Sequence, residues 1–339
     1  MNILLTCVGR RNYLVDYFKE ALHPYGGKVH AFNSDSNSAA FWQADFPVLS
    51  PLVNDSAYPG FLENYCITHH IKAIISFLDI ELPVLAGQKE RFSKLGITII
   101  VADPWVVDMA HDKWLTHQFL VKHQFQSVPT YIDLQSSLEA IRNGEVQFPL
   151  FVKPRWGMGS IALHQAENEE ELIFYFKKTR QTISSSYLKY VMNMEHDKSV
   201  LIQGMFPGQE YGLDIINDLN GKHIVTVVKQ KLAMRSGETD QAITVHHPQL
   251  EQLGAEIAAL TLHPANMDAD VFWDGENAYI LELNPRFGGG YPFSHAAGIN
   301  LPKAIIAWLQ NEPVDNKQWL TPKYGVEGMK GITIIVKSE

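Results

Sequence analysis

Residues 270–290 strongly restrict the possible folds, because they contain two β-type runs on either side of a tight turn. Asp274-Gly275 at the turn is a strong signal for a β-hairpin. Side chains alternate between the two faces of a strand, so Glu282 and Asn284 share one face. Folding the hairpin then places Asp270 roughly opposite Glu282. Two carboxylates held this close repel and raise each other's pKa unless a cation lies between them.

The oxygen atoms of Asp270, Glu282 and Asn284 form a donor set that suits Mg²⁺, or alternatively Mn²⁺, rather than zinc or copper. Arg286 follows two residues later and offers a planar guanidinium that suits a phosphate oxygen. Residues 288–290 are all glycine, which lets the backbone approach a ligand closely. A surface hairpin with solvated carboxylates is the alternative. The acids, arginine and glycines together favour a metal–phosphate site.

A second candidate phosphate site is the segment 148–163. Residues 148–154 are expected to form a strand that carries Lys153, and residues 161–163 to return as another strand. A loop between them can cover phosphates with backbone N–H groups, while the lysine neutralises their charge. A plain β-hairpin is the interpretation of this segment alone, but the metal hairpin favours nucleotide binding. The loop residues expected at the nucleotide are Gly157, Gly159 and Ser160.

Composition excludes several classes of protein. The chain has 339 residues, enough for two or three domains, and a net charge of −9, which disfavours a non-specific nucleic-acid binder. Cys7 and Cys66 are the only cysteines, so a disulfide framework or a thiolate zinc site is not expected. No signal peptide is evident, and no apolar run approaches the ~20 residues of a membrane helix. We therefore expect a cytoplasmic protein without nucleic-acid or membrane partners.

The first hundred residues alternate strands with helices, which predicts a parallel α/β sheet. The loop 6–11 after the first strand has a single glycine, so it is not the Gly-x-Gly-x-x-Gly dinucleotide fingerprint. Arg10 and Arg11 in this loop either meet an anionic substrate or are solvated. Asp79 and Glu81 follow a later strand, and they either accept hydrogen bonds from a substrate amine or stabilise a helix N-terminus.

Residues 331–336 have the sequence Gly-Ile-Thr-Ile-Ile-Val, which is typical of a strand. We expect them to form a final strand that completes a sheet. If the strand is left at an edge, it would instead pair with another subunit, as in a homodimer. By contrast, residues 232–239 are expected to form a polar segment after a strand at 224–231, with Arg235 on a loop.

The run Leu-Glu-Leu-Asn-Pro-Arg at 281–286 resembles the metal-binding signature of the ATP-grasp superfamily. Its continuation, Phe-Gly-Gly-Gly-Tyr-Pro, is similar to the carbamoyl-phosphate-synthetase-like and amino-acid-ligase branches. The resemblance covers nearly the whole chain and implies an α/β ATP-grasp fold. The implied parts are an N-terminal parallel α/β domain at 1–105 and an ATP-grasp region at 106–339, with a lid at about 129–205 and a C-terminal metal-binding subdomain at about 206–339.

The resemblance also implies how the nucleotide is held. Gln203 stands where the family often has Glu, which weakens one contact near the adenine. The backbone around Met205 and Phe206 is expected to hydrogen-bond the adenine, and Phe206 either stacks there or packs in the core. Glu210 matches the acid that holds the ribose hydroxyls. Lys113 matches a lysine that contacts nucleotide phosphate.

The implied reaction is transfer of a phosphoryl group from ATP to a substrate carboxylate. An amine then attacks the acyl phosphate to give an amide, ADP and phosphate. Lys113, Lys153 and the catalytic candidates Arg286 and Arg235 would offset the negative charge during transfer. Closure of the lid would exclude water. The partners expected are therefore a small carboxylate and a small amine, with ATP and Mg²⁺ as cofactors.

Three alternatives remain at this point. A carbamoyl-phosphate-synthetase-like enzyme would phosphorylate bicarbonate or carbamate, but only one ATP-binding module and no glutaminase segment are seen. A simple kinase would stop at the phosphorylated product. A non-catalytic ATP-binding protein is the third possibility, and the complete set of Asp270, Glu282 and Asn284 argues against it.

Overall fold

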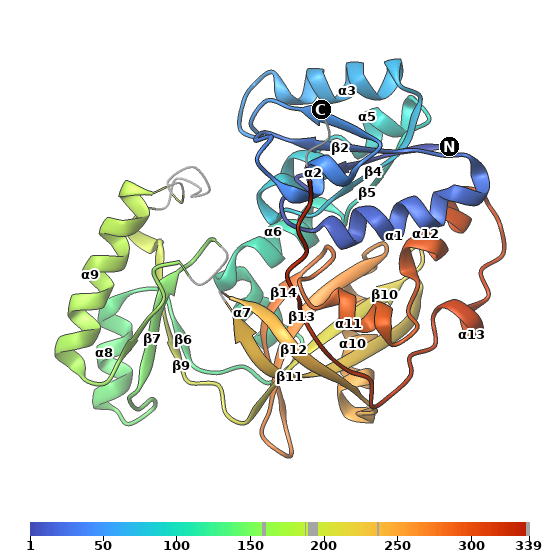
Figure 1. Ribbon diagram of the computed structural model, residues 1–339. Coiled ribbons are helices and arrows are strands. Elements are labelled where there is room, and N and C mark those ends of the chain that lie inside the picture. Colours follow the sequence, from blue (N-terminus) through green and yellow to red (C-terminus); the bar gives the residue numbers. More distant parts are fainter. Residues whose placement is uncertain (158–160, 187, 189–195, 236, 337–339) are drawn as a thin grey trace.

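The computed structural model describes residues 1–157, 161–186, 188, 196–235 and 237–336. Within these residues the strands form three sheets that follow one another along the chain (Figure 1). The first sheet is parallel, and the second and third are antiparallel. The α/β fold class expected from the sequence is therefore confirmed. The domain boundaries remain a prediction.

The N-terminal sheet is covered by helices on both faces. Its strand order is β3–β2–β1–β4–β5. On β1, Ile3 packs in the cluster that contains Phe18 of α1, while Leu4 packs in the cluster that contains Leu62 of α3. The strands are β1 Asn2–Thr6, β2 Val29–Asn33, β3 Phe46–Leu49, β4 Ile71–Ser76 and β5 Thr98–Ile100. The helices are α1 Asn12–Leu22, α2 Ala39–Gln43, α3 Tyr58–Thr68, α4 Leu82–Ala86 and α5 Lys89–Lys94, with short 3₁₀ turns η1 His23–Tyr25 and η2 Asp79–Glu81.

The direction of winding reverses between β1 and β4 of this sheet. In open α/β sheets, ligands bind in the crevice outside the carboxyl ends of the strands at such a reversal. The loops that follow β1 and β4 therefore flank the expected crevice. They carry Arg10 and Arg11 on one side and Asp79 on the other.

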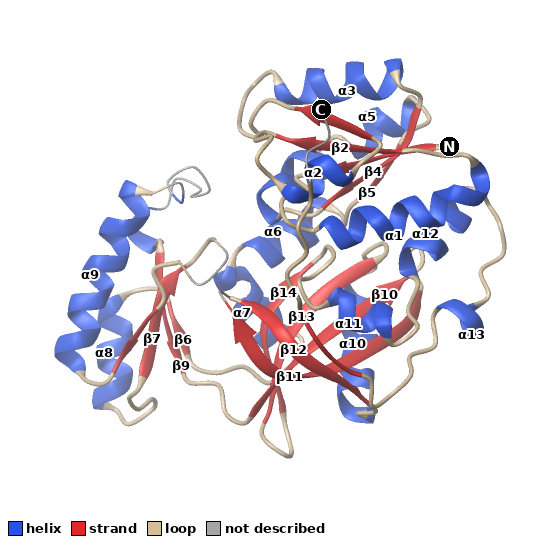
Figure 2. Cartoon of the chain, in the orientation of Figure 1, coloured by secondary structure: helices blue, strands red, loops and turns tan. Residues whose placement is uncertain are grey.

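A four-stranded sheet lies to one side of the molecule, at the left in Figures 1 and 2. Helices α6 Pro104–His111 and α7 Lys113–Lys122 precede it. Its strand order is β6–β9–β7–β8, and Leu172 and Ile183 of α9 pack against Leu150 and Val152 of β7. The elements are β6 Thr130–Tyr131, α8 Leu134–Arg142, β7 Leu150–Pro154, β8 His164–Ala166, α9 Glu169–Ser185, η4 His196–Lys198 and β9 Val200–Gly204.

The third sheet has the order β14–β13–β10–β11–β12–β15. Leu213 of β10 belongs to the cluster that contains α10, whereas Ile216 belongs to the cluster that contains α12, so helices cover both faces. The strands are β10 Gln209–Asn217, β11 His223–Arg235, β12 Glu238–Val245, β13 Asn266–Trp273, β14 Ala278–Asn284 and β15 Glu327–Met329. The helices are α10 Pro248–Thr261, α11 Tyr291–Ala296, α12 Leu301–Leu309 and α13 Asn316–Trp319.

Two sequence-based assignments of loops and strands were wrong. The strand expected to end at residue 231 continues, because β11 runs on to Arg235, so Arg235 lies on a strand rather than on a loop, and β12 begins at Glu238. The polar character of the segment reflects the exposure of this part of the hairpin, where even Leu232 and Met234 are exposed. Residues 161–163 are not a strand, because Ala162 has a left-handed backbone with φ +57° and β8 begins only at His164.

The expected strand at 331–336 was also wrong. The chain pairs with β12 earlier, at β15, where Gln241 lies opposite Met329. Since the pairing is antiparallel and β12 begins at Glu238, the partner strand ends before residues 333–336 could pair. Ile332, Ile334 and Val336 are left exposed. The homodimer stays a prediction.

No helix in the described part of the chain is long and apolar enough to cross a membrane.

Candidate functional site

The β13–β14 hairpin forms as the sequence predicts. Asp274 Oδ1 accepts hydrogen bonds from the backbone N–H groups of Glu276 and Asn277 in the turn. Asp270 lies opposite Glu282 in the register, and Asp268 lies opposite Asn284. The three predicted metal ligands therefore share a face of the sheet with a third carboxylate, Asp268, that the sequence analysis had not singled out.

Charged side chains gather on this face across four neighbouring strands. Gly212 of β10 pairs with Asp270 of β13, and Asp214 pairs with Asp268. Paired residues have their side chains on the same face of the sheet, so Asp214 shares the face of Asp268 and Asp270. The polar or charged residues on this face include Glu210, Asp214, Lys229, Lys231, Asn266, Asp268, Asp270, Glu282 and Asn284. The acids lie on β10, β13 and β14, whereas both ammonium groups lie on β11, where Lys229 pairs with Asp214 and Lys231 with Glu210 and Asp270.

Lys231 is the cation nearest to the predicted metal ligands. Its Nζ lies 2.6 Å from Glu210 Oε1 and 2.6 Å from Asp270 Oδ1. Burial would lower the pKa of Lys231, but the two carboxylates outweigh it and raise that pKa. Burial also raises the pKa of Asp270, with Asp268 adding to the effect, although the ammonium of Lys231 opposes it. Glu210, expected at the ribose, is thus joined through Lys231 to the predicted metal site.

Lys113 links the glycine loop to the hairpin. It is the first residue of α7, whose N-cap is Asp112. Lys113 Nζ donates to the carbonyl oxygen of Gly157 at 2.7 Å and lies 3.5 Å from Glu282 Oε1. Two of the residues predicted at the phosphates, Lys113 and Gly157, therefore meet at a predicted metal ligand. Gly159 and Ser160 lie outside the described residues.

Lys153 is a buried cation without a carboxylate partner among the described residues within 4.0 Å. Its Nζ donates to Gln203 Oε1 at 2.5 Å, and Gln203 Nε2 donates to the hydroxyl of Thr130. Burial, reinforced by the ammonium of Lys113, lowers the pKa of Lys153 to about 7. A buried ammonium of this kind favours an anionic ligand, because the ligand would compensate its charge.

A cavity of about 410 Å³ lies between the four-stranded sheet and the hairpin. This volume falls in the range of ~300–1,000 Å³ that is typical of small-molecule sites. Phe206 stacks on Phe272 in its wall, with ring centroids 5.3 Å apart, and Met205 is exposed. Lys113, Lys153, Gly157, Gln203, Met205, Phe206 and Glu282, all predicted site residues, line this one cavity.

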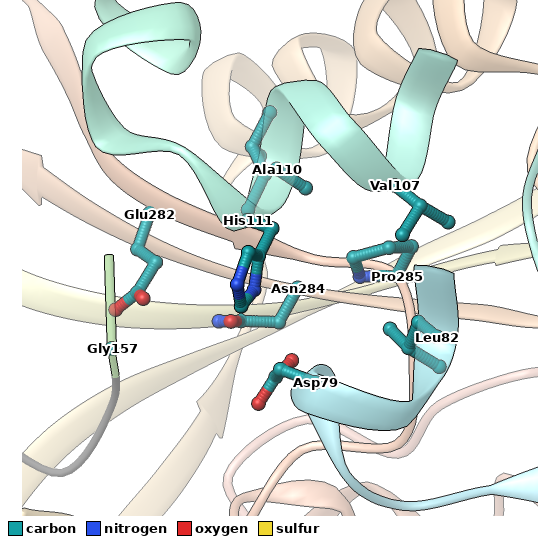
Figure 3. A pocket seen from close by; sticks show the side chains of 10 residues that line it. Asp79, Leu82, Val107, Ala110, His111, Gly157, Glu282, Asn284 and Pro285 are labelled. Atoms are coloured by element: carbon teal, nitrogen blue, oxygen red, sulfur yellow. The ribbon is translucent and has the colours of Figure 1, made fainter. Parts of the chain in front are cut away.

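A second cavity, of only about 10 Å³, adjoins the first at Gly157 and Glu282. Figure 3 shows the polar ends of Asp79, His111, Glu282 and Asn284 around it. The space is close to the minimum for one water molecule. His111, at the end of α6, was missed in the sequence because a single histidine before Asp112 carries no ligand-spacing pattern. Burial lowers its pKa.

Arg286 joins the hairpin to the N-terminal sheet. Its guanidinium lies 2.9 Å from Asp79 Oδ2 and 3.3 Å from Asp268 Oδ2. Burial would lower the pKa of Arg286, but these carboxylates outweigh it and raise that pKa. Asp79, one of the substrate candidates, is therefore held by Arg286. Burial would raise the pKa of Asp79, yet Arg286 lowers it.

The three other candidates near β4 and β1 have different surroundings. Glu81 is fully buried, and its carboxylate accepts hydrogen bonds from the hydroxyls of Thr6, Ser76 and Tyr58. It therefore joins the ends of β1 and β4 rather than lining the crevice. Arg10 is exposed, whereas Arg11 is partly buried and donates to two carbonyl oxygens.

Arg235 lies far out on the β11–β12 hairpin. Its side chain is 67% exposed and pairs with Asp240 at 2.9 Å. Neither cavity described above has Arg235 in its lining. A catalytic role for it would therefore require the hairpin or a ligand to bring it to the site.

Other site residues were missed because their signal is weak in one sequence. Lys229 and Lys231 are two apart in one strand, and so are Asp268 and Asp270, which puts each pair on a single face. This two-residue spacing was the sequence signal that these charged side chains share one face of the sheet. Lys229 pairs with the fully buried Asp214, a contact that only the pairing of β10 with β11 brings about.

The donor atoms of Asp270, Glu282 and Asn284 suit a hard divalent cation. They are two carboxylates and an amide on paired strands, and the raised pKa of Asp270 is the expected result of crowded buried acids. No group of three or more His, Cys, Asp or Glu side chains in the described chain is arranged to hold a metal. The predicted set, with one amide among three ligands, is not such a group.

Comparison with protein families gives two matches. Residues 3–100 match a model described as the N-terminal domain of PylC-like proteins. Residues 196–331 match a model described as an ATP-grasp in the biosynthetic pathway with the Ter operon.

Solved structures with similar folds cover most of the chain. The biotin carboxylase domain of Hydrogenobacter thermophilus 2-oxoglutarate carboxylase, solved as a dimer with MgADP, ADP and bicarbonate, has a TM-score of 0.73 and 16% identity over 95% of this chain and 72% of that one. L-amino acid ligase from Bacillus licheniformis has a TM-score of 0.65 and 16% identity over 95% and 77%. N5-carboxyaminoimidazole synthetase from Staphylococcus aureus, complexed with ADP, has a TM-score of 0.68 and 14% identity over 92% and 78%. These similarities confirm the expected ATP-grasp fold.

Replacing Arg286 and Arg235 compares the contribution of a buried and an exposed ion pair to folding stability, because both arginines are ion-paired but only Arg286 is buried. Arg286→Met leaves Asp79 and Asp268 without their cation, so we expect a loss of about 3 kcal/mol of folding free energy. Arg235→Met removes an exposed pair and should cost less than about 1 kcal/mol. Thermal unfolding of both variants measures the difference. Equal shifts in the unfolding midpoint would contradict the described contacts of Arg286.

Proposed function

We propose that the chain, which has the ATP-grasp fold and matches an ATP-grasp model at residues 196–331, is an ATP-dependent carboxylate–amine ligase that releases ADP and phosphate. One observation carries the proposal. The oxygen donors of Asp270, Glu282 and Asn284 share a sheet face at the edge of a 410 Å³ cavity that Lys113 and Lys153 line. The solved L-amino acid ligase and the ADP-bound synthetase with this fold support it.

In this proposal, the 410 Å³ cavity takes ATP. Phe206, Phe272 and Met205 supply apolar walls for the adenine at one end. Lys153 and Lys113 lie toward the hairpin, where the phosphates would compensate their charge. The ammonium of Lys113 exchanges its hydrogen bond to the carbonyl oxygen of Gly157 for one to a phosphate oxygen. Glu210 remains within reach of the ribose hydroxyls at the end of β10.

Asp270, Glu282 and Asn284 are the residues that would hold Mg²⁺. When bound, Mg²⁺ offsets the negative charge of the phosphates during transfer. Lys231 already offsets part of the charge of Asp270 and Glu210, so the site does not depend on the metal alone for its electrostatic balance. Arg286 is ion-paired with Asp79 and Asp268 and follows Asn284 by two residues, and we assign it the role of orienting an anionic group.

The reaction proposed has two steps. A carboxylate oxygen of the substrate attacks the γ-phosphorus of ATP, and the bond from that phosphorus to the bridging oxygen of ADP breaks. The amine nitrogen then attacks the carbonyl carbon of the acyl phosphate, phosphate leaves, and the nitrogen loses its proton. The described residues contribute binding, orientation and charge compensation, which are the main sources of catalysis in phosphoryl transfer.

Hydroxylamine should trap the acyl phosphate that the protein forms. Incubation with Mg-ATP, hydroxylamine and a panel of amino acids, simple carboxylic acids and bicarbonate should give ADP and a hydroxamate with an acid in the panel. With that acid and its amine, oxygen-18 in the carboxylate should appear in the released phosphate. Mass spectrometry measures both products.

Glu282→Gln is the control for this assay, because it removes the central anionic donor and should abolish turnover. Release of AMP and pyrophosphate, or retention of all the label in the product, would contradict the proposed chemistry. Turnover with bicarbonate alone would favour a carboxylase or carbamoyl-phosphate-type reaction, as in the neighbour solved with bicarbonate.

Nucleotide binding should also take up a proton at Lys153. The pKa of this buried lysine is about 7, so at pH 8 it is mostly neutral before binding. A phosphate next to Lys153 favours its ammonium form and raises its pKa. The protein should therefore take up nearly one proton per bound nucleotide at pH 8, and less than that at pH 6, where Lys153 is already mostly protonated. Calorimetric titration with Mg-ADP in buffers of different ionisation enthalpy counts the protons. In Lys153→Met the uptake at pH 8 should fall by nearly one proton; an unchanged count would place the titrating group elsewhere.

A further inference from the structure

The loop that follows β1 carries Arg11, whose guanidinium is held by carbonyl oxygens rather than by carboxylates. Arg11 Nη1 donates to the carbonyl oxygen of Phe77 at 2.8 Å and to that of Phe287 at 2.7 Å. No carboxylate of the described residues lies within 4.0 Å of its guanidinium. Carbonyl groups hold the guanidinium in place, but they do not neutralise it.

The neighbouring arginine shows the contrast. Arg286 has two carboxylates, Asp79 and Asp268, within 3.3 Å. These three side chains keep between 10% and 14% of their surface exposed, and Asp79 also lines the small cavity beside Glu282 and Asn284. Burial and the repulsion of Arg286 lower the pKa of Arg11, although the more distant carboxylates of Asp79 and Glu238 oppose this shift.

The position of Arg11 relates it to the transfer site. It follows β1 at the reversal of the parallel sheet, where ligands of open α/β folds bind. Its hydrogen bond to the carbonyl oxygen of Phe287 is made next to Arg286, just after the strand that carries Glu282 and Asn284. A group bound by Arg11 would therefore lie between the N-terminal sheet and the predicted metal ligands.

We propose that Arg11 binds a carboxylate of the acid substrate in the crevice between β1 and β4. A guanidinium held by carbonyls through one nitrogen can still offer its remaining N–H groups in the planar fork that matches a carboxylate. This assignment rests on the proposed ligase function and adds to it the residue that recognises the acid. Arg11 is a binding residue in this account, and Arg286 keeps the role of orienting groups at the hairpin.

The chain supplies a matched control in Arg10. Arg10→Gln and Arg11→Gln remove the same charge at adjacent positions, but Arg10 is exposed and lacks the two carbonyl contacts. Arg11→Lys keeps the charge and loses the planar fork, and it serves if Arg11→Gln folds poorly. Binding of Mg-ADP, measured first in each protein, reports whether the nucleotide site is intact.

The probes are sodium acetate, glycine and bicarbonate, each titrated onto the Mg-ADP complex against sodium chloride of equal ionic strength. The shift of the thermal unfolding midpoint gives the apparent affinity. We expect acetate or glycine to stabilise the wild type and Arg10→Gln similarly. Arg11→Gln should bind at least tenfold more weakly, and Arg11→Lys should fall between them.

Four results would overturn the assignment. The first two are no stabilisation of the wild type by acetate or glycine, and unchanged affinity in Arg11→Gln. The third is an equal loss of affinity in Arg10→Gln. The fourth is Arg11-dependent binding of bicarbonate but not of acetate or glycine, which would mean that Arg11 binds an inorganic anion. Failure of the wild type to bind Mg-ADP would instead refute the proposed function. The two proposals can therefore fail separately.

Discussion

The crowding of carboxylates on one face of the β10–β14 part of the sheet is the interaction on which the rest of the site depends. Strand alternation and the β13–β14 register put Asp268, Asp270 and Glu282 on the same face. Buried acids this close are tolerated only when cations lie among them. The chain provides Lys231 at Asp270, Lys113 at Glu282 and Arg286 at Asp268. A divalent cation and nucleotide phosphates would then enter a site whose charges are already nearly balanced.

The same balance holds separate parts of the chain together. Lys113 comes from the helix before the four-stranded sheet, and its contacts reach both Gly157 of that sheet's loop and Glu282 of the hairpin. Arg286 reaches across to Asp79 after β4, and Arg11 reaches from the end of β1 to Phe287. Ligand binding between these parts would change contacts on three sheets at once. This arrangement explains why residues from distant parts of the sequence line the two adjoining cavities.

Much of the site could be predicted because its signals are local. The Asp-Gly turn and the two-residue period placed Asp270, Glu282 and Asn284 together, and the glycine loop marked Lys153. Lys231 and Asp214 could not be assigned, because their importance arises only when β10, β11 and β13 pair. The strand expected at 331–336 failed for a similar reason: a β-like pattern cannot reveal that the neighbouring strand β12 begins at Glu238.

The central claim is that Glu282 and its neighbours bind Mg²⁺ together with a nucleotide. Its most direct test is the affinity for ADP with and without Mg²⁺, measured by calorimetry in the wild type and in Glu282→Gln. The account predicts that Mg²⁺ tightens ADP binding at least about tenfold in the wild type, or about 1.4 kcal/mol, and less than about twofold in the variant. An equal effect of Mg²⁺ in both proteins, or no ADP binding by the wild type, would contradict it.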